Sequence, residues 1–137
     1  MPYAEDYHAS VLILGPDKST VLIHDETRPP PRLWKFPGGK MEAGEDPYDT
    51  VIRETWEETG LHLDRSRLRL IGEQAKKGHV KYFFIATIDS FDGLVKRSKE
   101  REITGIFKLE ELKKMVDFHP TYRGFYDLAQ EASYIPA

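Results

Sequence analysis

Hydrophobic residues fall into several short runs along the 137-residue chain, and these runs predict its strands. The aliphatic runs Ala9–Gly15 and Thr20–His24, separated by Pro16 to Ser19, predict a hairpin of two largely buried strands. After a proline-rich loop, a short alternating segment at Leu33–Phe36 leads into a glycine turn. Later runs predict strands at Arg67–Glu73, His79–Ile88 and Ile103–Phe107. Because several joins are short, a mixed sheet is expected rather than an all-parallel one.

Helical spacing appears in two segments near the C-terminus, Leu109–Val116 and Thr121–Ala132, with a break at His119–Pro120 between them. The apolar stripe of the first segment consists of Leu109, Leu112 and Val116. The stripe of the second consists of Tyr122, Phe125, Leu128, Ala129 and Ala132. We find no internal repeat and no linker, so we expect one domain over residues 1–137, in line with roughly 100–200 residues per domain.

The segment from Asp46 to Leu61 carries the start and stop signals of a helix. Asp46 suits the N-cap, Pro47 the first turn, and Gly60 the position after the last turn. At about 100° per residue, one side of this helix is a continuous stripe that we expect to be buried: Val51, Ile52, Thr55, Trp56 and Thr59. The same spacing places Glu54, Glu57 and Glu58 together on the opposite face.

These three carboxylates lie where a helix tolerates them poorly. Glu57 and Glu58 are in the last turn, where the helix dipole disfavours anions by about 0.3–1 kcal/mol each. A solvated acidic face is the ordinary interpretation of such a run. A divalent cation held by the carboxylates explains the placement better, and hard oxygen ligands favour Mg²⁺, or Mn²⁺ in its place. The preceding loop, Pro37 to Glu45, contains three glycines and is suited to bringing backbone groups against a metal or a phosphate.

Taken together, Gly39 to Leu61 read G-x₅-E-x₇-R-E-T-x-E-E-x-G-L. This pattern resembles the signature of the Nudix hydrolases, in which an aliphatic residue usually stands at the position of Thr55. Since Thr55 falls on the buried stripe, the departure concerns packing more than chemistry. The lead-in from Trp34 to Lys40 and the short chain are similar to compact, MutT-like members.

The resemblance implies a fold and a set of roles. The implied fold is a three-layer α/β/α sandwich with a mixed β-sheet (α+β), in which residues 39–61 form a loop, a helix and a loop. The implied metal ligands are Glu54, Glu57, Glu58 and the carbonyl of Gly38. Arg53 is grouped with Glu57 and Glu58 as catalytic, and Arg53, Glu45 and Gly60 are implied to hold loop and helix in place.

A later acidic residue completes the implied catalytic group. Glu100 is the candidate for a further metal ligand or general base, with Glu102 the second choice. The alternative for Glu100 is an ordinary solvated acid in a basic loop, Lys96 to Arg101. That basic loop is itself a candidate contact for triphosphate oxygens, although a solvated loop explains it equally well.

Substrate contacts are expected from the lead-in, at Trp34, Gly39 and Lys40. Trp34, Phe36, Tyr82 and Phe84 have rings that a base can stack on, but aromatic residues in strands are more often part of the core. The implied reaction is Mg²⁺-dependent hydrolysis of a nucleoside diphosphate linked to another group. A nucleoside or deoxynucleoside triphosphate, cleaved to monophosphate and pyrophosphate, is favoured. The alternatives are ADP-ribose, a dinucleoside polyphosphate, an RNA 5′ end, or a noncatalytic nucleotide-sensing module.

Composition narrows the partners. The chain has 20 Lys and Arg against 23 Asp and Glu, a formal net charge of −3, which argues against long nucleic acids. It has no cysteine, so disulfides and thiolate metal sites are excluded. No apolar run approaches the roughly 18 residues of a membrane span, and the N-terminus has no signal-like apolar stretch. We expect a cytoplasmic enzyme acting on a small nucleotide, with no membrane partner and no prediction of its oligomeric state.

Overall fold

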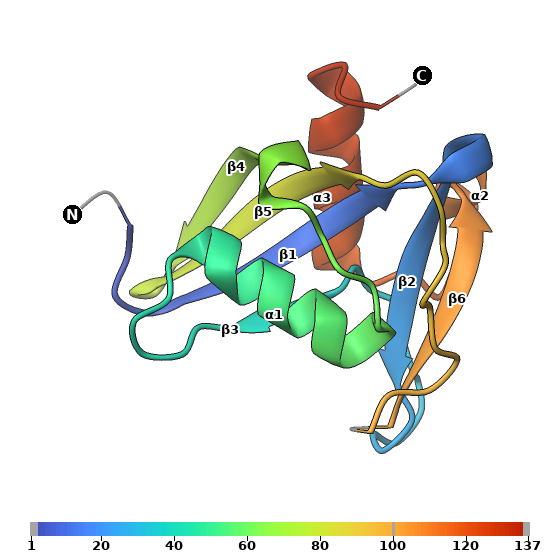
Figure 1. Ribbon diagram of the computed structural model, residues 1–137, viewed down its shortest axis with the longest axis horizontal. Helices are drawn as coiled ribbons and strands as arrows, with labels where there is room; N and C mark the ends of the chain where they lie inside the picture. The colour runs from blue at the N-terminus through green and yellow to red at the C-terminus, as the bar shows by residue number, and fades with distance from the viewer. Residues whose placement is uncertain (1–2, 100, 136–137) are drawn as a thin grey trace.

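The computed structural model describes residues 3–99 and 101–135, and a mixed four-stranded sheet lies at its centre (Figure 1). The strands, in spatial order, are β3 (Gly38–Lys40), β1 (Tyr7–Leu14), β5 (His79–Thr87) and β4 (Leu68–Lys76). β1 is parallel to β5 and antiparallel to β3, and β4 is antiparallel to β5. The predicted mixed sheet is therefore confirmed.

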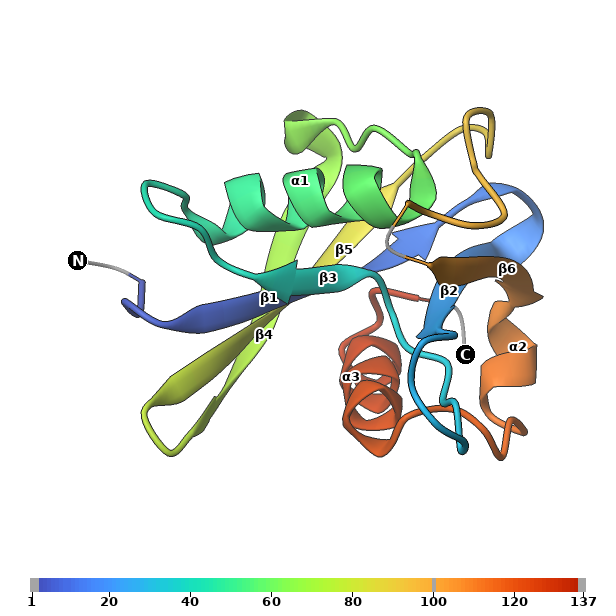
Figure 2. The same ribbon diagram turned by 90° about the horizontal axis from the view of Figure 1, so that it is seen from below.

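Helices cover both faces of this sheet. Figure 2 shows α1 (Pro47–Thr59) on one side and α3 (Pro120–Glu131) on the other. A second, two-stranded sheet is formed by β2 (Ser19–Asp25) and β6 (Glu102–Lys108), and the short helix α2 (Leu109–Leu112) follows β6. The layered α/β/α arrangement expected from the sequence is confirmed.

Two hydrophobic clusters explain why the central strands are apolar throughout. On β1, Tyr7, Ala9, Val11 and Ile13 belong to the cluster beneath α1, whereas Leu12 belongs to the cluster beneath α3. β5 alternates in the same way, because successive side chains of a strand point to opposite faces. Since both faces of these strands are buried, their sequences read as near-continuous hydrophobic runs.

The predicted hairpin between the first two strands is wrong. Both segments are strands, but β1 pairs with β5 along one edge and with β3 at His8 to Ser10 on the other, and not with β2. β2 pairs instead with β6 over its whole length. The connection between β1 and β2 is a short 3₁₀ turn, Pro16–Lys18, with a single bridge between Gly15 and Ser19.

The helical stripes are confirmed in part. Trp56 was expected in the core but is 51% exposed, at the edge of the α1 stripe and against His62. Val116 is 97% exposed, because α2 ends at Leu112 and the chain turns before reaching it. In the last helix, Leu128 and Ala132 lie outside the buried set.

No helix in the described part of the chain combines the length and the apolar character that a bilayer crossing requires.

Candidate active site

Strong caps hold α1 in a fixed position. Asp46 and Asp49 form a capping box, in which each side chain accepts a hydrogen bond from the other's backbone N–H, at 2.8 and 3.0 Å. At the other end Gly60 adopts a left-handed conformation with φ of 80°. A Cβ there would lie 2.4 Å from the carbonyl oxygen of Gly93, so only glycine fits. The length and direction of the glutamate-bearing helix are thereby set.

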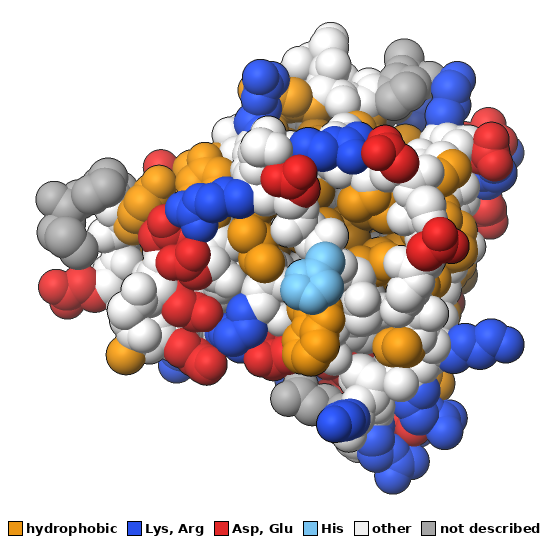
Figure 3. Space-filling view, in the orientation of Figure 1, with side chains coloured by type: hydrophobic (Ala, Val, Ile, Leu, Met, Phe, Trp, Pro, Cys, Tyr) orange, Lys and Arg blue, Asp and Glu red, His pale blue; other side chains and the backbone are white. Residues whose placement is uncertain are grey.

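Arg53 lies at the centre of a group of carboxylates that we call the acidic cluster: Glu42, Glu45, Glu54 and Glu57. Its guanidinium donates to both oxygens of Glu45, at 2.7 and 3.0 Å, and to Glu54 at 2.9 Å. A longer contact of 3.3 Å reaches Glu57. Figure 3 shows acidic side chains gathered over the face that carries α1. Hydrogen bonds to Glu45 and Glu54 raise the pKa of Arg53, and the Arg53 guanidinium lowers the pKa of Glu45.

The same arginine attaches the glycine-rich loop to the helix. Its second terminal nitrogen donates to the carbonyl oxygen of Lys40 at 3.0 Å. Glu45 also accepts from the hydroxyl of Thr50 at 2.9 Å and from the backbone N–H of Glu42 at 2.8 Å. These contacts give Arg53 and Glu45 the surroundings that their implied holding role requires.

Glu58 lies apart from the acidic cluster, and here the expectation that all three glutamates face away from the core is wrong. Its side chain is buried, with 3% exposure, and its Oε1 accepts a hydrogen bond of 2.8 Å from the backbone N–H of Gly38. Burial raises the pKa of Glu58 well above its usual range, and the charge of the buried Glu102 raises it further. Helical spacing alone could not show this burial, because β3 and β6, which pack against α1, are distant from it in the sequence or unpredictable in their position.

Glycine at position 39 makes room for Glu54. A Cβ on Gly39 would lie 2.3 Å from the carboxyl carbon of Glu54, so the carboxylate rests directly against the backbone. Glycine at position 38 is equally constrained, since its Cβ would lie 2.1 Å from the carbonyl oxygen of Ala9. Both glycines thus let β3 approach α1 and β1 closely.

The predicted metal ligands do not lie in a ready-made metal site. Among residues 3–99 and 101–135, no three carboxylate or imidazole side chains are arranged to hold a metal ion as they stand. The reason is that Arg53 contacts Glu54 and Glu57, while Glu58 faces Gly38. The donor set nevertheless suits a hard cation, because three carboxylates occupy adjacent turns and two of them, Glu54 and Glu58, repel each other.

The remaining catalytic and substrate candidates are divided. Glu100 lies outside the described residues, whereas Glu102 is buried and close enough to Glu58 to affect its charge. Lys40 is exposed and its side-chain role stays a prediction. The basic loop faces an acid of its own, because Arg97 and Arg101 each contact Glu26 at 3.0 Å.

The aromatic candidates are mainly part of the core, as the alternative interpretation had it. Phe36, Tyr82 and Phe84 are all buried. Trp34 packs edge-on between His24 and Phe107, with ring centres 4.4 and 4.9 Å away. Its role in substrate binding therefore stays a prediction.

Sequence reasoning missed a group of cationic and imidazole side chains that the fold brings together on the α3 side of β1. The group includes Lys35, Lys81, His8 and His119, which are scattered over most of the chain. The only local signal was the pair of arginines, Arg28 and Arg32, in the proline-rich loop. These side chains line one hollow of the described structure.

Comparison with known proteins fits this architecture. The family model described as NUDIX domain matches residues 5–129, which is most of the chain. The chain therefore belongs to the Nudix hydrolase family. Members of this family generally use divalent metal ions.

Two curated relatives illustrate the range of the similarity. Mouse (Mus musculus) diphosphoinositol polyphosphate phosphohydrolase 3-alpha is 32% identical over 111 residues, covering 77% of this chain and 65% of that protein. Nucleoside diphosphate-linked moiety X motif 6 of Xenopus laevis is 39% identical over 62 residues, covering 45% of this chain and 29% of that protein. The chain thus spans less than two thirds of the length of these relatives.

A solved structure supports the fold. A MutT structure, from work on Aliivibrio salmonicida and Vibrio cholerae, superposes with a TM-score of 0.76. It covers 91% of this chain and 98% of its own, at 23% sequence identity. At that identity the likeness concerns the fold alone.

Proposed function

We propose that this protein hydrolyses the phosphoanhydride bond of a small molecule in which a nucleoside diphosphate is linked to a second group. The observation that carries the proposal is the position of Glu58, a buried carboxylate beside the buried Glu102 and next to Glu54 and Glu57 on one helix. Buried like charges are costly unless a counterion accompanies them. A divalent cation bound beside these carboxylates would supply that counterion.

The residues that would hold the ion are Glu54, Glu57 and Glu58, and the carbonyl of Gly38, the residue whose N–H donates to Glu58, is a further candidate. When bound there, Mg²⁺, or Mn²⁺ in its place, neutralises phosphate oxygens and lowers the pKa of a coordinated water. The N–H of Gly38 orients Glu58, and Arg53 fixes the carboxylates of Glu45 and Glu54. Glu102 is our candidate for accepting the proton of the attacking water.

The identity of the substrate is narrowed by what the relatives' names share. One is named for nucleoside diphosphate-linked moieties and the other for diphosphoinositol polyphosphates. A diphosphate group is common to both. We place a nucleoside or deoxynucleoside triphosphate first, because the motif and lead-in are MutT-like, and a diphosphate conjugate second.

The test is a panel of nucleoside triphosphates, ADP-ribose and dinucleoside polyphosphates incubated with Mg²⁺, with products identified by mass. A monophosphate plus pyrophosphate indicates a triphosphate substrate, whereas two phosphate-bearing fragments indicate a conjugate. Glu57→Gln removes one charge without changing the size of the side chain, and we expect it to abolish turnover. Nucleotide binding without any turnover would instead favour the noncatalytic sensing module. Turnover that Glu57→Gln leaves intact would contradict the metal assignment.

A further inference from the structure

A hollow of about 380 Å³ opens on the α3 side of the sheet and is strongly cationic. We call it the basic pocket and define it by six of its lining residues: His8, Arg28, Arg32, Lys35, Lys81 and His119. They come from β1, the loop after β2, β5 and the start of α3. Asp25 is the one acidic side chain among the lining residues that the structure describes.

The charges of this pocket are poorly compensated. Asp25 accepts hydrogen bonds from the backbone and hydroxyl of Thr27 and contacts Arg28 at 3.4 Å. Neither Lys35 nor Lys81 forms an ion pair with any residue in the described part of the chain. Burial lowers the pKa of Lys81, and the charge of Lys35 lowers it further. Cations held this close together, with Asp25 as the one acid among the described lining residues, are ready to bind an anionic ligand.

The tyrosine among the described lining residues is already covered. Tyr122 lines the hollow but is buried, with the Lys81 ammonium 5.7 Å above its ring and His119 edge-on at 5.3 Å. Trp34, which does not line the hollow, is half-buried and contacts His24 and Phe107 edge-on. Tyr122 therefore offers no open face to a nucleobase, whereas phosphate groups find several cationic donors in the pocket.

The basic pocket adjoins the proposed catalytic site through Gly38. On one side the N–H of Gly38 donates to Glu58. On the other, the position of a Cβ on Gly38 is 2.7 Å from the hydroxyl of Ser10, which in turn lies 3.4 Å from the hydroxyl of Tyr122. Because β3 is the edge strand of the sheet, a molecule whose diphosphate lies at the glutamates reaches the pocket by passing around β3.

We propose that the basic pocket binds a multiply phosphorylated part of the substrate, distinct from the diphosphate that is cleaved. This inference rests on the proposed hydrolysis and, within it, favours the diphosphate conjugate over the triphosphate: the second group is a moiety bearing several phosphates rather than an uncharged base or sugar. Two sources share this chemistry, an extended polyphosphate chain and a compact ring with several phosphate monoesters. Lys35 and Lys81 at the base of the pocket and Arg28 and Arg32 at its rim contact the phosphates.

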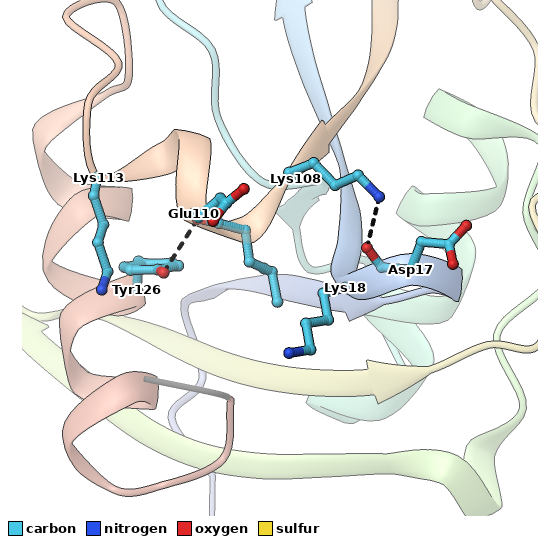
Figure 4. A pocket seen from close by; sticks show the side chains of 7 residues that line it. Asp17, Lys18, Lys108, Glu110, Lys113 and Tyr126 are labelled. Carbon is cyan, nitrogen blue, oxygen red and sulfur yellow. Dashed lines mark hydrogen bonds between the residues drawn. The ribbon is translucent and has the colours of Figure 1, made fainter.

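A second hollow serves as the matched control. Figure 4 shows Lys18, Lys108 and Lys113 in a pocket of about 340 Å³ beside α2. Here the lysines are accompanied by the acids Asp17 and Glu110, and Lys108 donates to the carbonyl oxygen of Asp17 at 2.9 Å. Because its charges are mixed, we expect this pocket to bind anions no better than ordinary surface does.

The test is calorimetric titration of the metal-free protein in a chelating buffer. The probes are inositol hexakisphosphate for the compact ring, tetrapolyphosphate for the chain, and inorganic phosphate as the reference. We expect one of the polyphosphates to bind at least about tenfold more tightly than phosphate. Lys81→Gln and Arg32→Gln should each weaken that binding by about tenfold. Lys113→Gln makes the same charge change in the other pocket and should alter it less than about twofold.

Each result decides the matter. Weakening by Lys81→Gln and Arg32→Gln but not by Lys113→Gln supports the pocket, and the preferred probe identifies the source of the phosphates. Equal weakening by all three variants, or no preference over phosphate, overturns it. Because no metal is present and no bond is cleaved, this outcome is independent of the hydrolysis assay. Failure of turnover with intact probe binding would contradict the proposed function instead.

Discussion

The acidic cluster and the basic pocket lie on opposite sides of β3, yet their charges are handled differently. The acidic cluster has its own counterion, since Arg53 contacts four carboxylates. The basic pocket gathers four permanent cations around a single acid, Asp25. A metal binding at the glutamates must therefore share its ligands with Arg53, whereas an anion entering the pocket displaces no described ion pair of Lys35 or Lys81.

Glu58 sharpens the comparison because it belongs to neither group. It is buried against Gly38 and repelled by Glu102, and the charge of Lys35 compensates it only in part. The acidic side of the molecule thus contains one part that stabilises the fold and one part that costs stability. A buried residue that lowers the stability of the fold, as Glu58 does, is a candidate for a functional role.

The largest effect is expected from Glu58→Gln. Turnover should fall by several orders of magnitude, because the variant lacks a charge proposed to hold the metal. The free energy of unfolding at pH 8 should rise by about 1 kcal/mol, since an acid whose pKa is raised in the folded state loses stability as pH increases. Activity and urea unfolding measured on the same sample check both parts.

Glu110→Gln, which removes an exposed charge on α2, is the control and should change neither quantity appreciably. If Glu58→Gln lowers stability and activity together, its loss of activity reports misfolding rather than the loss of a ligand.

The next largest effect is expected from Arg53→Ala. Removing the counterion leaves Glu45 and Glu54 facing each other at a partly buried position, which should cost about 3 kcal/mol of unfolding free energy. Chemical denaturation measures this. Arg65→Ala removes two ion pairs, to Asp46 and Asp49, from a half-exposed arginine and should cost much less unfolding free energy, because solvent screens exposed pairs. Equal costs would contradict the central role of Arg53.

A smaller effect, on the other side of the sheet, is expected from His8→Gln. Burial lowers the pKa of His8 to about 4, and the charges of Lys81 and Lys35 contribute. The unfolded chain therefore binds a proton that the folded chain does not, and stability is lost as pH falls from about 6.5 toward 4. The glutamine variant lacks this proton and should lose about 2 kcal/mol less over that window.

Unfolding curves at pH 7.5 and at pH 4.5 measure the difference. The two proteins should respond alike near pH 7.5, where His8 is neutral in both states. Parallel losses at low pH would mean that burial and the cations of the pocket do not lower the pKa of His8.

Local chemistry let the sequence predict α1 closely. The Asp46 cap, the glycine stop at position 60 and the spacing of the glutamates are short-range features, and all are found where they were expected. Pairing of strands was less predictable. The apolar runs of β1 and β2 predicted a hairpin, but β1 pairs with β3 and β5, and β2 pairs with β6. Such partners are set by segments far away in the sequence.

The site shows the same division. Helical spacing places Glu54, Glu57 and Glu58 on one face of α1, but it cannot tell which of them a neighbouring strand will cover. The burial of Glu58 depends on residues far along the chain, Gly38 and Glu102 among them. The basic pocket was hidden for the same reason, because Lys81 becomes a neighbour of His8 only when β5 pairs with β1.

The sequence by itself thus determined the family, the glutamate-bearing helix and its caps, because these follow from residues a few positions apart. Only the tertiary structure decided how the charges are shared. The fold places Arg53 in contact with the acidic cluster and buries Glu58 beside Glu102. It leaves Lys35 and Lys81 without an ion-pair partner among the described residues. Coulomb interactions and desolvation depend on distance and burial in space, and neither can be read from separation along the chain.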